Sequence, residues 1–142
     1  MFLKQLSIFI ENREGRLEKV TETLAANGIN IVCISLADTS EYGLLRMIVS
    51  DPDKGKQILK DNGFSAMLTN VVAVKIPHSF GTLHTITKEL SANELNIEYM
   101  YAFTSGMDNA SIIIKTNDND KALSVLTAKG FEMLDPEYAY NL

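Results

Sequence analysis

An internal repeat constrains the fold of this chain more than any other feature. Residues 15–31, GRLEKVTETLAANGINI, align without a gap on residues 81–97, GTLHTITKELSANELNI. The identical pairs are Gly15/Gly81, Leu17/Leu83, Thr21/Thr87, Leu24/Leu90, Ala26/Ala92, Asn27/Asn93, Asn30/Asn96 and Ile31/Ile97. After one inserted residue, DPDKGKQILKDNGF (51–64) aligns on DNDKALSVLTAKGF (118–131). One supersecondary unit of about 70 residues is therefore expected to occur twice.

The apolar pattern of each half predicts the order strand, helix, strand, strand, helix, strand. In the first half these elements are expected at 3–10, 16–27, 29–37, 44–49, a helix that opens at Asp51-Pro52 and closes at Gly63, and 64–69. In the second half they are expected at 71–76, 82–94, 95–104, 111–116, 119–129 and 131–135.

This order predicts an α+β protein built from two ferredoxin-like βαββαβ units, each an antiparallel sheet with both helices on one face. We expect the domains to be residues 1–70 and 71–142, with their sheets packed side by side because so small a half buries little core alone. The join around Asn70 is not rich in Pro, Gly or Ser, so no flexible linker is expected there. The second strands, 29–37 and 95–104, are expected at sheet edges, paired with each other or with another chain.

Composition excludes several classes of function. A net charge of −5 and a pI near 5.0 argue against nucleic acid, since phosphate binding needs a basic face. No apolar run approaches the roughly 20 residues of a membrane span, and the N-terminus does not resemble a signal peptide. The single cysteine, Cys33, cannot form an internal disulfide, so a cytoplasmic location is expected.

No convincing catalytic, metal or cofactor site assembles from the sequence, so we do not expect an enzyme. His78 and His84 lie six residues apart without other metal ligands nearby, and His84 is best interpreted as a solvated helix residue. The stretch TNDNDK (116–121) resembles a calcium loop only superficially, because it lacks the central glycine and the closing glutamate, and helix capping explains it better. Cys33 is expected to be an inert buried thiol.

The two turns ENREGRL (11–17) and PHSFGTL (77–83) are the remaining candidates. In the structural interpretation, Gly15 and Gly81 permit a tight connection from strand to helix that a β-carbon would obstruct. In the functional interpretation, the turn presents free backbone N–H groups at a helix N-terminus, where the dipole favours a carboxylate. Asn12 and Asn30 add amides that donate and accept, as a zwitterionic amino acid requires. Both interpretations stay open at this point.

The stretch IENREGRLEKVTETLAANGINI resembles the opening of an ACT domain, a small-molecule regulatory module of amino-acid metabolism. Because the pattern recurs, nearly the whole chain resembles a tandem ACT protein. In that family, effectors bind between the loop after strand one and the second strand of a paired domain. The resemblance therefore implies a site formed by Asn12, Arg13, Glu14, Gly15, Arg16, Leu17, Asn30 and Ile31, and in the second half by His78, Phe80, Gly81, Thr82, Leu83, Asn96 and Ile97.

The ENR.G turn is also similar to that of the serine-sensing domain of D-3-phosphoglycerate dehydrogenase, whose ligand-binding asparagines fall on Asn12 and Asn30. Ile10 replaces the histidine of that domain and Glu14 replaces the usual proline, so the resemblance does not identify serine as the ligand. In the second half, His78 takes the position of Asn12. The two sites are therefore not equivalent.

These implications favour a non-catalytic regulatory module that binds a free amino acid, forms a homodimer and acts on a separate regulated enzyme. An assembly module without a ligand is the alternative, and a small enzyme using His78 as acid or base is a third. Tyr99, Tyr101 and Phe103, on one face of a strand, suggest either a surface for a planar ligand or an oligomer contact.

Overall fold

The computed structural model of the protein describes residues 1–38, 41–77, 79–104 and 110–142. They form two compact units, each made mostly of one half of the chain. The N-terminal unit contains Lys4–Thr69 together with Ala139–Leu142, and the C-terminal unit contains Asn70–Tyr138 together with Met1–Leu3. Each unit therefore includes a short segment from the opposite end of the chain.

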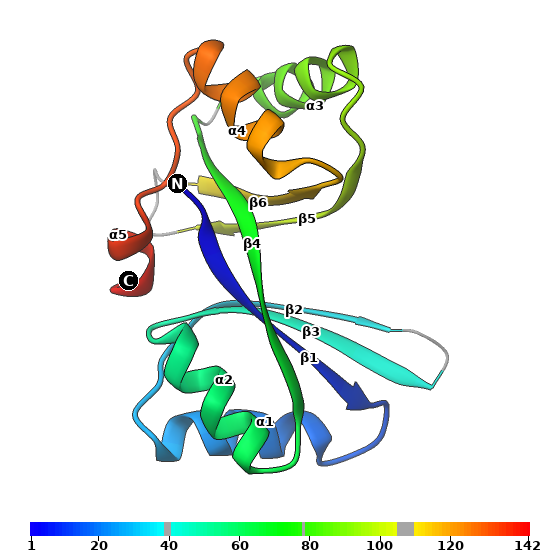
Figure 1. The fold of residues 1–142 in the computed structure, drawn as a ribbon, viewed down its shortest axis with the longest axis vertical. Helices are drawn as coiled ribbons and strands as arrows, with labels where there is room; N and C mark the ends of the chain where they lie inside the picture. The colour runs from blue at the N-terminus through cyan, green and yellow to red at the C-terminus, as the bar shows by residue number, and fades with distance from the viewer. Residues whose placement is uncertain (39–40, 78, 105–109) are drawn as a thin grey trace. The chain divides into compact units, whose positions relative to one another are not determined.

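The N-terminal unit is an antiparallel sheet with two helices. Its elements are β1 (Leu3–Glu11), α1 (Arg16–Ala26), β2 (Ile31–Asp38), β3 (Tyr42–Val49), α2 (Pro52–Asp61) and the first part of β4 (Ser65–Ile76). The strand order is β2-β3-β1-β4. Figure 1 shows α1 and α2 on the same face of these strands, which is the ferredoxin-like arrangement that the sequence predicts.

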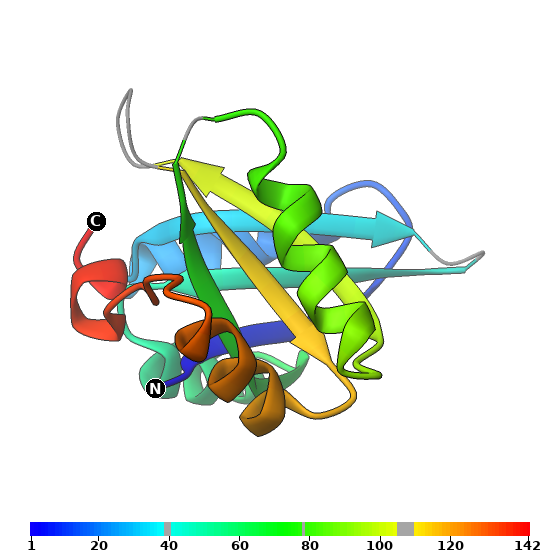
Figure 2. The same ribbon diagram turned by 90° about the horizontal axis from the view of Figure 1, so that it is seen from above.

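The C-terminal unit repeats this arrangement. It contains the second part of β4, α3 (Thr82–Ala92), β5 (Ile97–Thr104), β6 (Ala110–Thr116), α4 (Asn119–Ala128) and most of α5 (Pro136–Tyr140). The strand order is β4-β6-β5, and Figures 1 and 2 show α3 and α4 on one face of these strands. The predicted α+β class with tandem ferredoxin-like units is confirmed, whereas the side-by-side packing of the sheets and the division into domains 1–70 and 71–142 stay predictions.

The expected last strand, 131–135, is not formed. Only Met133 bridges to Val74 of β4, supported by bonds from Lys75 N to Glu132 O (2.8 Å) and from Leu134 N to Ala73 O (2.9 Å). The segment stops pairing because Asp135 starts α5, a helix that the sequence pattern does not predict. Asp135 Oδ1 accepts hydrogen bonds from the N–H groups of Glu137 and Tyr138 at 2.8 and 3.2 Å.

The join between the halves lies inside a strand. The sequence predicts two strands, 64–69 and 71–76, but β4 runs without a break from Ser65 to Ile76. The expectation that no flexible linker occurs at Asn70 agrees with this continuity.

Each unit has its own apolar core between sheet and helices. The buried members are Leu6, Ile8, Ile10, Val20, Leu24, Ile29, Leu45, Met47, Val49, Leu59 and Phe64 in the N-terminal unit, and Val72, Val74, Ile86, Leu90, Leu95, Ile112, Ile114, Ala122 and Leu126 in the C-terminal unit. Full burial of one large aliphatic side chain contributes roughly 1.5–3 kcal/mol. These alternating strand residues and helix stripes are the positions that the periodicity of the sequence indicates.

Capping explains much of the repeated sequence. Asp51 and Asp118 cap α2 and α4 by accepting hydrogen bonds from Lys54 N (3.1 Å) and Lys121 N (3.0 Å). The sequence predicts both caps, the second because helix capping explains the TNDNDK stretch better than a calcium loop does. The side-chain amides of Asn27 and Asn93 end α1 and α3 by donating to the carbonyls of the fourth residue before each, both at 2.8 Å. The pair Asn27/Asn93 therefore has a structural role.

The chain ends are bound into the units that they join. Phe2 packs against the core of the C-terminal unit. Ala139 is fully buried, and the Tyr140 hydroxyl accepts a 2.8 Å hydrogen bond from Lys4 N in the N-terminal unit. The Lys4 side chain also forms an ion pair with Asp53 at 2.9 Å. The hydrogen bond to the Asp53 carboxylate, together with the negative charge of that group, raises the pKa of Lys4.

The second strands of the repeats, β2 and β5, are the outermost strands among the described residues, as predicted. Both contain a β-bulge near the start, between Ile31 and Cys33 in β2 and between Ile97 and Tyr99 in β5. A bulge at the same place in both halves increases the twist of the edge, which protects an unpaired strand from nonspecific pairing.

Candidate functional site

The two glycine turns have the same backbone. Gly15 and Gly81 both have φ of 82° and precede the first residue of α1 and α3. A β-carbon added at either position would meet no atom within 4 Å. The expectation that a β-carbon would be obstructed is therefore wrong: glycine is needed because L-residues disfavour this left-handed conformation.

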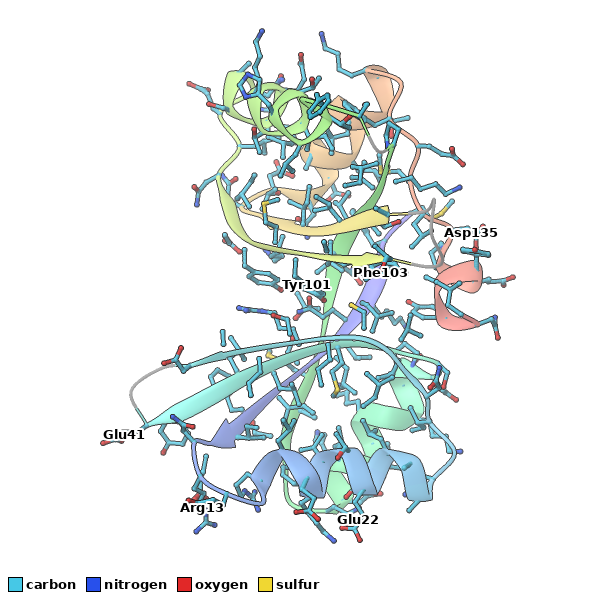
Figure 3. All side chains as sticks on the ribbon, turned by 180° about the vertical axis from the view of Figure 1, so that it is seen from behind. Arg13, Glu22, Glu41, Tyr101, Phe103 and Asp135 are labelled. Carbon is cyan, nitrogen blue, oxygen red and sulfur yellow. The ribbon has the colours of Figure 1, made fainter. Side chains whose placement is uncertain are left out.

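The first turn is tied to the neighbouring hairpin. Asn12 N donates to Glu41 O at 3.1 Å, and Arg13 N donates to Glu11 O at 2.9 Å. The Arg13 side chain forms an ion pair with Glu11, Nε to Oε2, at 2.8 Å. Figure 3 shows Arg13 and Glu41 at the same end of the N-terminal unit. This turn and the β2–β3 hairpin therefore form one surface.

A cavity of about 210 Å³ opens between this turn and the ends of β2 and β3. The lining residues are Ile10, Glu11, Asn12, Arg13, Leu17, Leu36, Ala37, Asp38 and Gly43. They meet because β1 and β2 both pair antiparallel with β3, so that Ile10 and Asp38 both lie opposite Gly43. Three of the predicted site residues, Asn12, Arg13 and Leu17, line this cavity.

The cavity combines an apolar floor with a charged rim. Ile10 is buried, Leu17 is half-buried and Leu36 is half-exposed. Glu11, Arg13 and Asp38 supply two carboxylates and one guanidinium at the exposed rim. Such a site offers anions to an ammonium group and a cation to a carboxylate, next to a surface that favours hydrocarbon.

The other predicted residues of the first turn do not line this cavity. Glu14 and Gly15 are exposed. Arg16 packs its guanidinium over the Phe64 ring at 4.8 Å from the ring centroid, and its Nε is buried without a hydrogen-bond partner among the described residues. Arg16 therefore has a packing contact on the core side of the helix start.

Asn30 and Ile31 lie at the other end of the N-terminal unit. Asn30 N donates to Ser50 Oγ and Asn30 O accepts from Ser50 N, both at 2.9 Å, while Ile31 packs against the core. Ile31 pairs with Val49 and Glu11 pairs with Tyr42, seven residues away along β3 (49 − 42), so about 23 Å separates the two ends. One unit alone does not bring Asn12 and Asn30 together.

The second turn differs in its side chains. Phe80 is fully exposed, at 109% of its reference area, and Leu83 is 43% exposed. Thr82 Oγ1 lies 2.7 Å from Ser79 Oγ, and His78 lies outside the described residues. Asn96 N donates to Asn117 Oδ1 at 2.9 Å, and Ile97 packs against its core, as their first-half counterparts do.

A second cavity, of about 630 Å³, lies in the C-terminal unit beside the end of β4. Its wall includes Lys75, Phe131, Glu132, Asp135 and Tyr138. Lys75 is paired with Glu132, and the Asp135 carboxylate caps α5. None of the site residues that the resemblance implies is among the described residues that line this second cavity.

Five lining residues of the first cavity are not indicated by the turn motif: Glu11, Leu36, Ala37, Asp38 and Gly43. The register of the strand pairing identifies these residues. Because β1 and β2 both pair antiparallel with β3, the turn after β1 and the hairpin after β2 lie at the same end of the sheet. Gly43 precedes the predicted strand 44–49, whereas the observed β3 begins one residue earlier still, at Tyr42, and includes it.

Several other expectations concern single residues. His84 is exposed on α3, as expected. Burial raises the pKa of Cys33 to about 11, so the thiol stays protonated at neutral pH. Tyr99, Tyr101 and Phe103 pair with Lys115, Ile113 and Ser111 on the sheet face away from the helices, and Figure 3 shows Tyr101 and Phe103 on that side of β5.

Two further findings limit the chemistry of the described residues. They contain no group of three or more His, Cys, Asp or Glu side chains placed to hold a metal ion. Across residues 1–38, 41–77, 79–104 and 110–142, no helix is long and apolar enough to cross a membrane.

Comparison with known proteins agrees with this architecture. No curated protein matches the chain. Among solved structures, protein BT0572 from Bacteroides thetaiotaomicron is 42% identical, with a TM-score of 0.93, covering 100% of this chain and 98% of that one. The regulatory subunits of aspartate kinase from Thermus thermophilus, in a ligand-free form, and from Thermus flavus have TM-scores of 0.65 and 0.61. They are 18% and 19% identical, covering 88% of this chain and 91% and 90% of theirs, and share the fold.

A family model described as an ACT domain pair matches residues 1–141. The match extends over both repeats and therefore agrees with the repeated order of helices and strands and with the two glycine turns. The chain belongs to the ACT domain pair family.

Proposed function

We propose that this protein is a non-catalytic regulatory module that binds a free amino acid at the first glycine turn. The observation that supports this most is the cavity of about 210 Å³, where Asn12 and Arg13 stand at the rim of an apolar floor. Cavities for drug-sized ligands measure roughly 300–1,000 Å³, so this one suits a smaller molecule. The structural neighbours named as regulatory subunits of aspartate kinase add support at the level of the fold.

The head group of the ligand has partners of both signs. The α-carboxylate binds the Arg13 guanidinium and the amide N–H of Asn12, with the positive end of the α1 dipole nearby. The α-ammonium binds the Asp38 and Glu11 carboxylates and the Asn12 carbonyl. Arg13 is already paired with Glu11, so a ligand inserts its two charges into an existing ion pair.

A second domain completes the site. Since Asn30 lies about 23 Å from the first turn of its own unit, the implied contribution of Asn30 and Ile31 comes from a paired domain. We propose a homodimer in which β2 edges supply these residues, and we assign one ACT domain each to residues 1–70 and 71–142. The half-exposed Ile34 and Leu36 on β2 support such pairing.

Such a module would transmit its signal by associating with another protein. We propose that ligand binding changes the affinity for a separate regulated enzyme, because allosteric coupling requires the ligand to favour one state over another. The second turn, with Phe80, Gly81, Thr82, Leu83, Asn96 and Ile97, is proposed as a weaker or different site together with His78. We propose a cytoplasmic location because Cys33 is a free thiol, as is usual in a reducing compartment.

The test is a thermal-shift screen of the twenty amino acids followed by calorimetry on the best binder. Asn12→Ala removes hydrogen bonds of which at least one is to a charged group, worth about 1.5–3 kcal/mol, so the Kd should rise about tenfold or more. Asn70→Ala, at an exposed asparagine of β4 outside the cavity, is the matched control and should leave the Kd unchanged.

The alternative function, a ligand-free assembly module, makes a different prediction. In that case no amino acid raises the melting temperature, while the dimer persists in light scattering. An affinity that is unchanged in Asn12→Ala would instead move the ligand away from the first turn.

A further inference from the structure

The second cavity lies where the last segment of the second repeat leaves the sheet. In the first repeat this position is taken by the first part of β4, which pairs with β1. In the second repeat Met133 forms a single bridge to β4, and Asp135 then turns the chain into α5. One wall of the cavity therefore consists of residues between Lys129 and Tyr138, and the other consists of the ends of β4 and β6.

The size of this cavity indicates a ligand larger than a free amino acid. Its volume is about 630 Å³, compared with about 210 Å³ for the first cavity. Cavities for drug-sized ligands measure roughly 300–1,000 Å³ and bury most of the ligand surface. A single amino acid would leave much of the second cavity to water, whereas a molecule with two linked rings would fill it better.

A row of polar side chains crosses one face of the sheet at this cavity. Lys75 lies opposite Ser111 of β6, and its amide N donates to Glu132 O at 2.8 Å. Directly opposed residues of antiparallel strands place their side chains on the same face. Neighbouring strands lie about 4.8 Å apart, so these three positions extend over about 10 Å. The carboxylate, the ammonium and the buried Ser111 hydroxyl offer acceptors and donors to a ligand with several polar groups.

Aromatic and apolar side chains flank this row. Phe131 is half-buried and packs against the core of the C-terminal unit, whereas Tyr138 is 51% exposed. Both rings line the cavity together with the buried Leu134. Stacking of a planar base on an aromatic side chain is favourable for every base, because each has a π-face. The cavity therefore combines surfaces for a planar ring with hydrogen-bonding groups.

The charges of the wall favour an uncharged ligand. The wall holds two lysines and two carboxylates. Lys75 forms an ion pair with Glu132, and Lys129 forms one with Glu89 of α3 at 3.5 Å. A phosphate group would compete with these carboxylates for the lysines and would lie near Asp135 as well, and placing like charges together is costly.

We propose that the second cavity is a separate ligand site that binds an uncharged nucleoside. The base lies against the rings of Phe131 and Tyr138, and the sugar hydroxyls bond the Glu132 carboxylate and the Ser111 hydroxyl. This site goes beyond the amino-acid site at the first turn and does not depend on it.

Calorimetry of the full-length protein with adenosine tests this site. Tyr138→Ala removes one ring from the wall, so the Kd for adenosine should rise about fivefold or more, the factor that corresponds to one lost stacking contact. Tyr138→Phe keeps the ring and should leave the Kd close to that of the wild-type protein. Tyr42→Ala is the matched control, because Tyr42 is 50% exposed and does not line the second cavity, and it should not change the Kd.

Two further probes test the class of ligand. Adenosine monophosphate should bind more weakly than adenosine, because its phosphate meets the carboxylates of the wall. Tryptophan has a planar ring but lacks the sugar hydroxyls, and it should also bind more weakly. If either compound binds more tightly than adenosine, the nucleoside class is wrong.

The outcomes separate this site from the amino-acid site. Adenosine affinity that falls equally in Tyr138→Ala and Tyr42→Ala, or no binding of adenosine to the wild-type protein, overturns the nucleoside site and leaves the amino-acid proposal intact. A screen in which none of the twenty amino acids binds overturns the first-turn proposal alone.

Discussion

The β1–α1 turn and the β4–α3 turn share a backbone and differ in chemistry. Gly15 and Gly81 have the same φ of 82°, and each carbonyl starts its helix by accepting from the residue four positions on, at 3.0 and 2.9 Å. The residues that precede them in the sequence are Glu11, Asn12, Arg13 and Glu14 in the first turn and Pro77, His78, Ser79 and Phe80 in the second.

The comparison shows that the backbone geometry of the turn recurs in both repeats, whereas the chemistry of its side chains does not. The glycine, the helix start and the strand register are needed for folding, so they recur. The charged rim does not recur, because the second repeat has Pro77 and Ser79 in place of Glu11 and Arg13. Recurrence by itself therefore indicates a structural requirement, and divergence between the repeats indicates where a ligand site can differ.

The largest expected effect tests the shared backbone. Gly15→Val and Gly81→Val each force a branched side chain into the left-handed region, and each should lower the free energy of unfolding by about 2 kcal/mol. Urea denaturation of the two variants is the measurement. A loss at one position only would show that the two turns are not structurally equivalent.

The next effect tests the difference in charge. Arg13→Ser gives the first turn the residue of the second and removes the cation proposed to bind the carboxylate, so the Kd for the amino acid found by the thermal-shift screen should rise about tenfold or more. The reverse change, Ser79→Arg, should create no measurable binding at the second turn, because Pro77 stands where Glu11 supplies a carboxylate in the first turn. Calorimetry on both variants decides this, and a gain of affinity in Ser79→Arg would mean that charge alone distinguishes the turns.

A smaller effect tests the equivalence of the helix ends. Asn27→Ala and Asn93→Ala each remove one side-chain hydrogen bond of 2.8 Å to a helix carbonyl, and each should cost about 1 kcal/mol of stability. Thermal melting of both variants should give similar shifts without any change in ligand affinity. A change in affinity for Asn27→Ala alone would assign this asparagine to the site.

The smallest effect concerns the exposed aromatic ring of the second turn. Phe80→Ser should change stability by less than about 0.5 kcal/mol, because the ring is fully exposed. Ile86→Ala, on the same helix but fully buried, should cost about 2–5 kcal/mol. If chemical denaturation shows that Phe80→Ser is strongly destabilising, the ring is covered in solution by another surface.

The sequence predicts the elements well where periodicity and caps agree. The helices α1 and α3 begin at the predicted residues and end within two residues of the expected positions, because Gly15 and Asn27 and their counterparts are unambiguous local signals. The last strand fails for a local reason as well. Asp135 and Pro136 start a helix whose short length gives almost no periodicity, so the apolar residues before it resemble a strand.

The site was predicted in part, for a physical reason. Asn12, Arg13 and Leu17 belong to one turn and are found from the local motif. Leu36, Asp38 and Gly43 join them only through the pairing of β1 and β2 with β3, and register is not encoded in any single segment.

The exchange of chain ends has a consequence for any attempt to divide the protein. A fragment cut at residue 70 would lack the buried Ala139 and the Tyr140 hydroxyl that bonds Lys4, and the complementary fragment would lack Phe2 in its core. The unit of sequence duplication is therefore smaller than the unit of cooperative folding. Cloned halves should be aggregation-prone or only partly folded, and mixing them should restore both, as in protein fragment complementation.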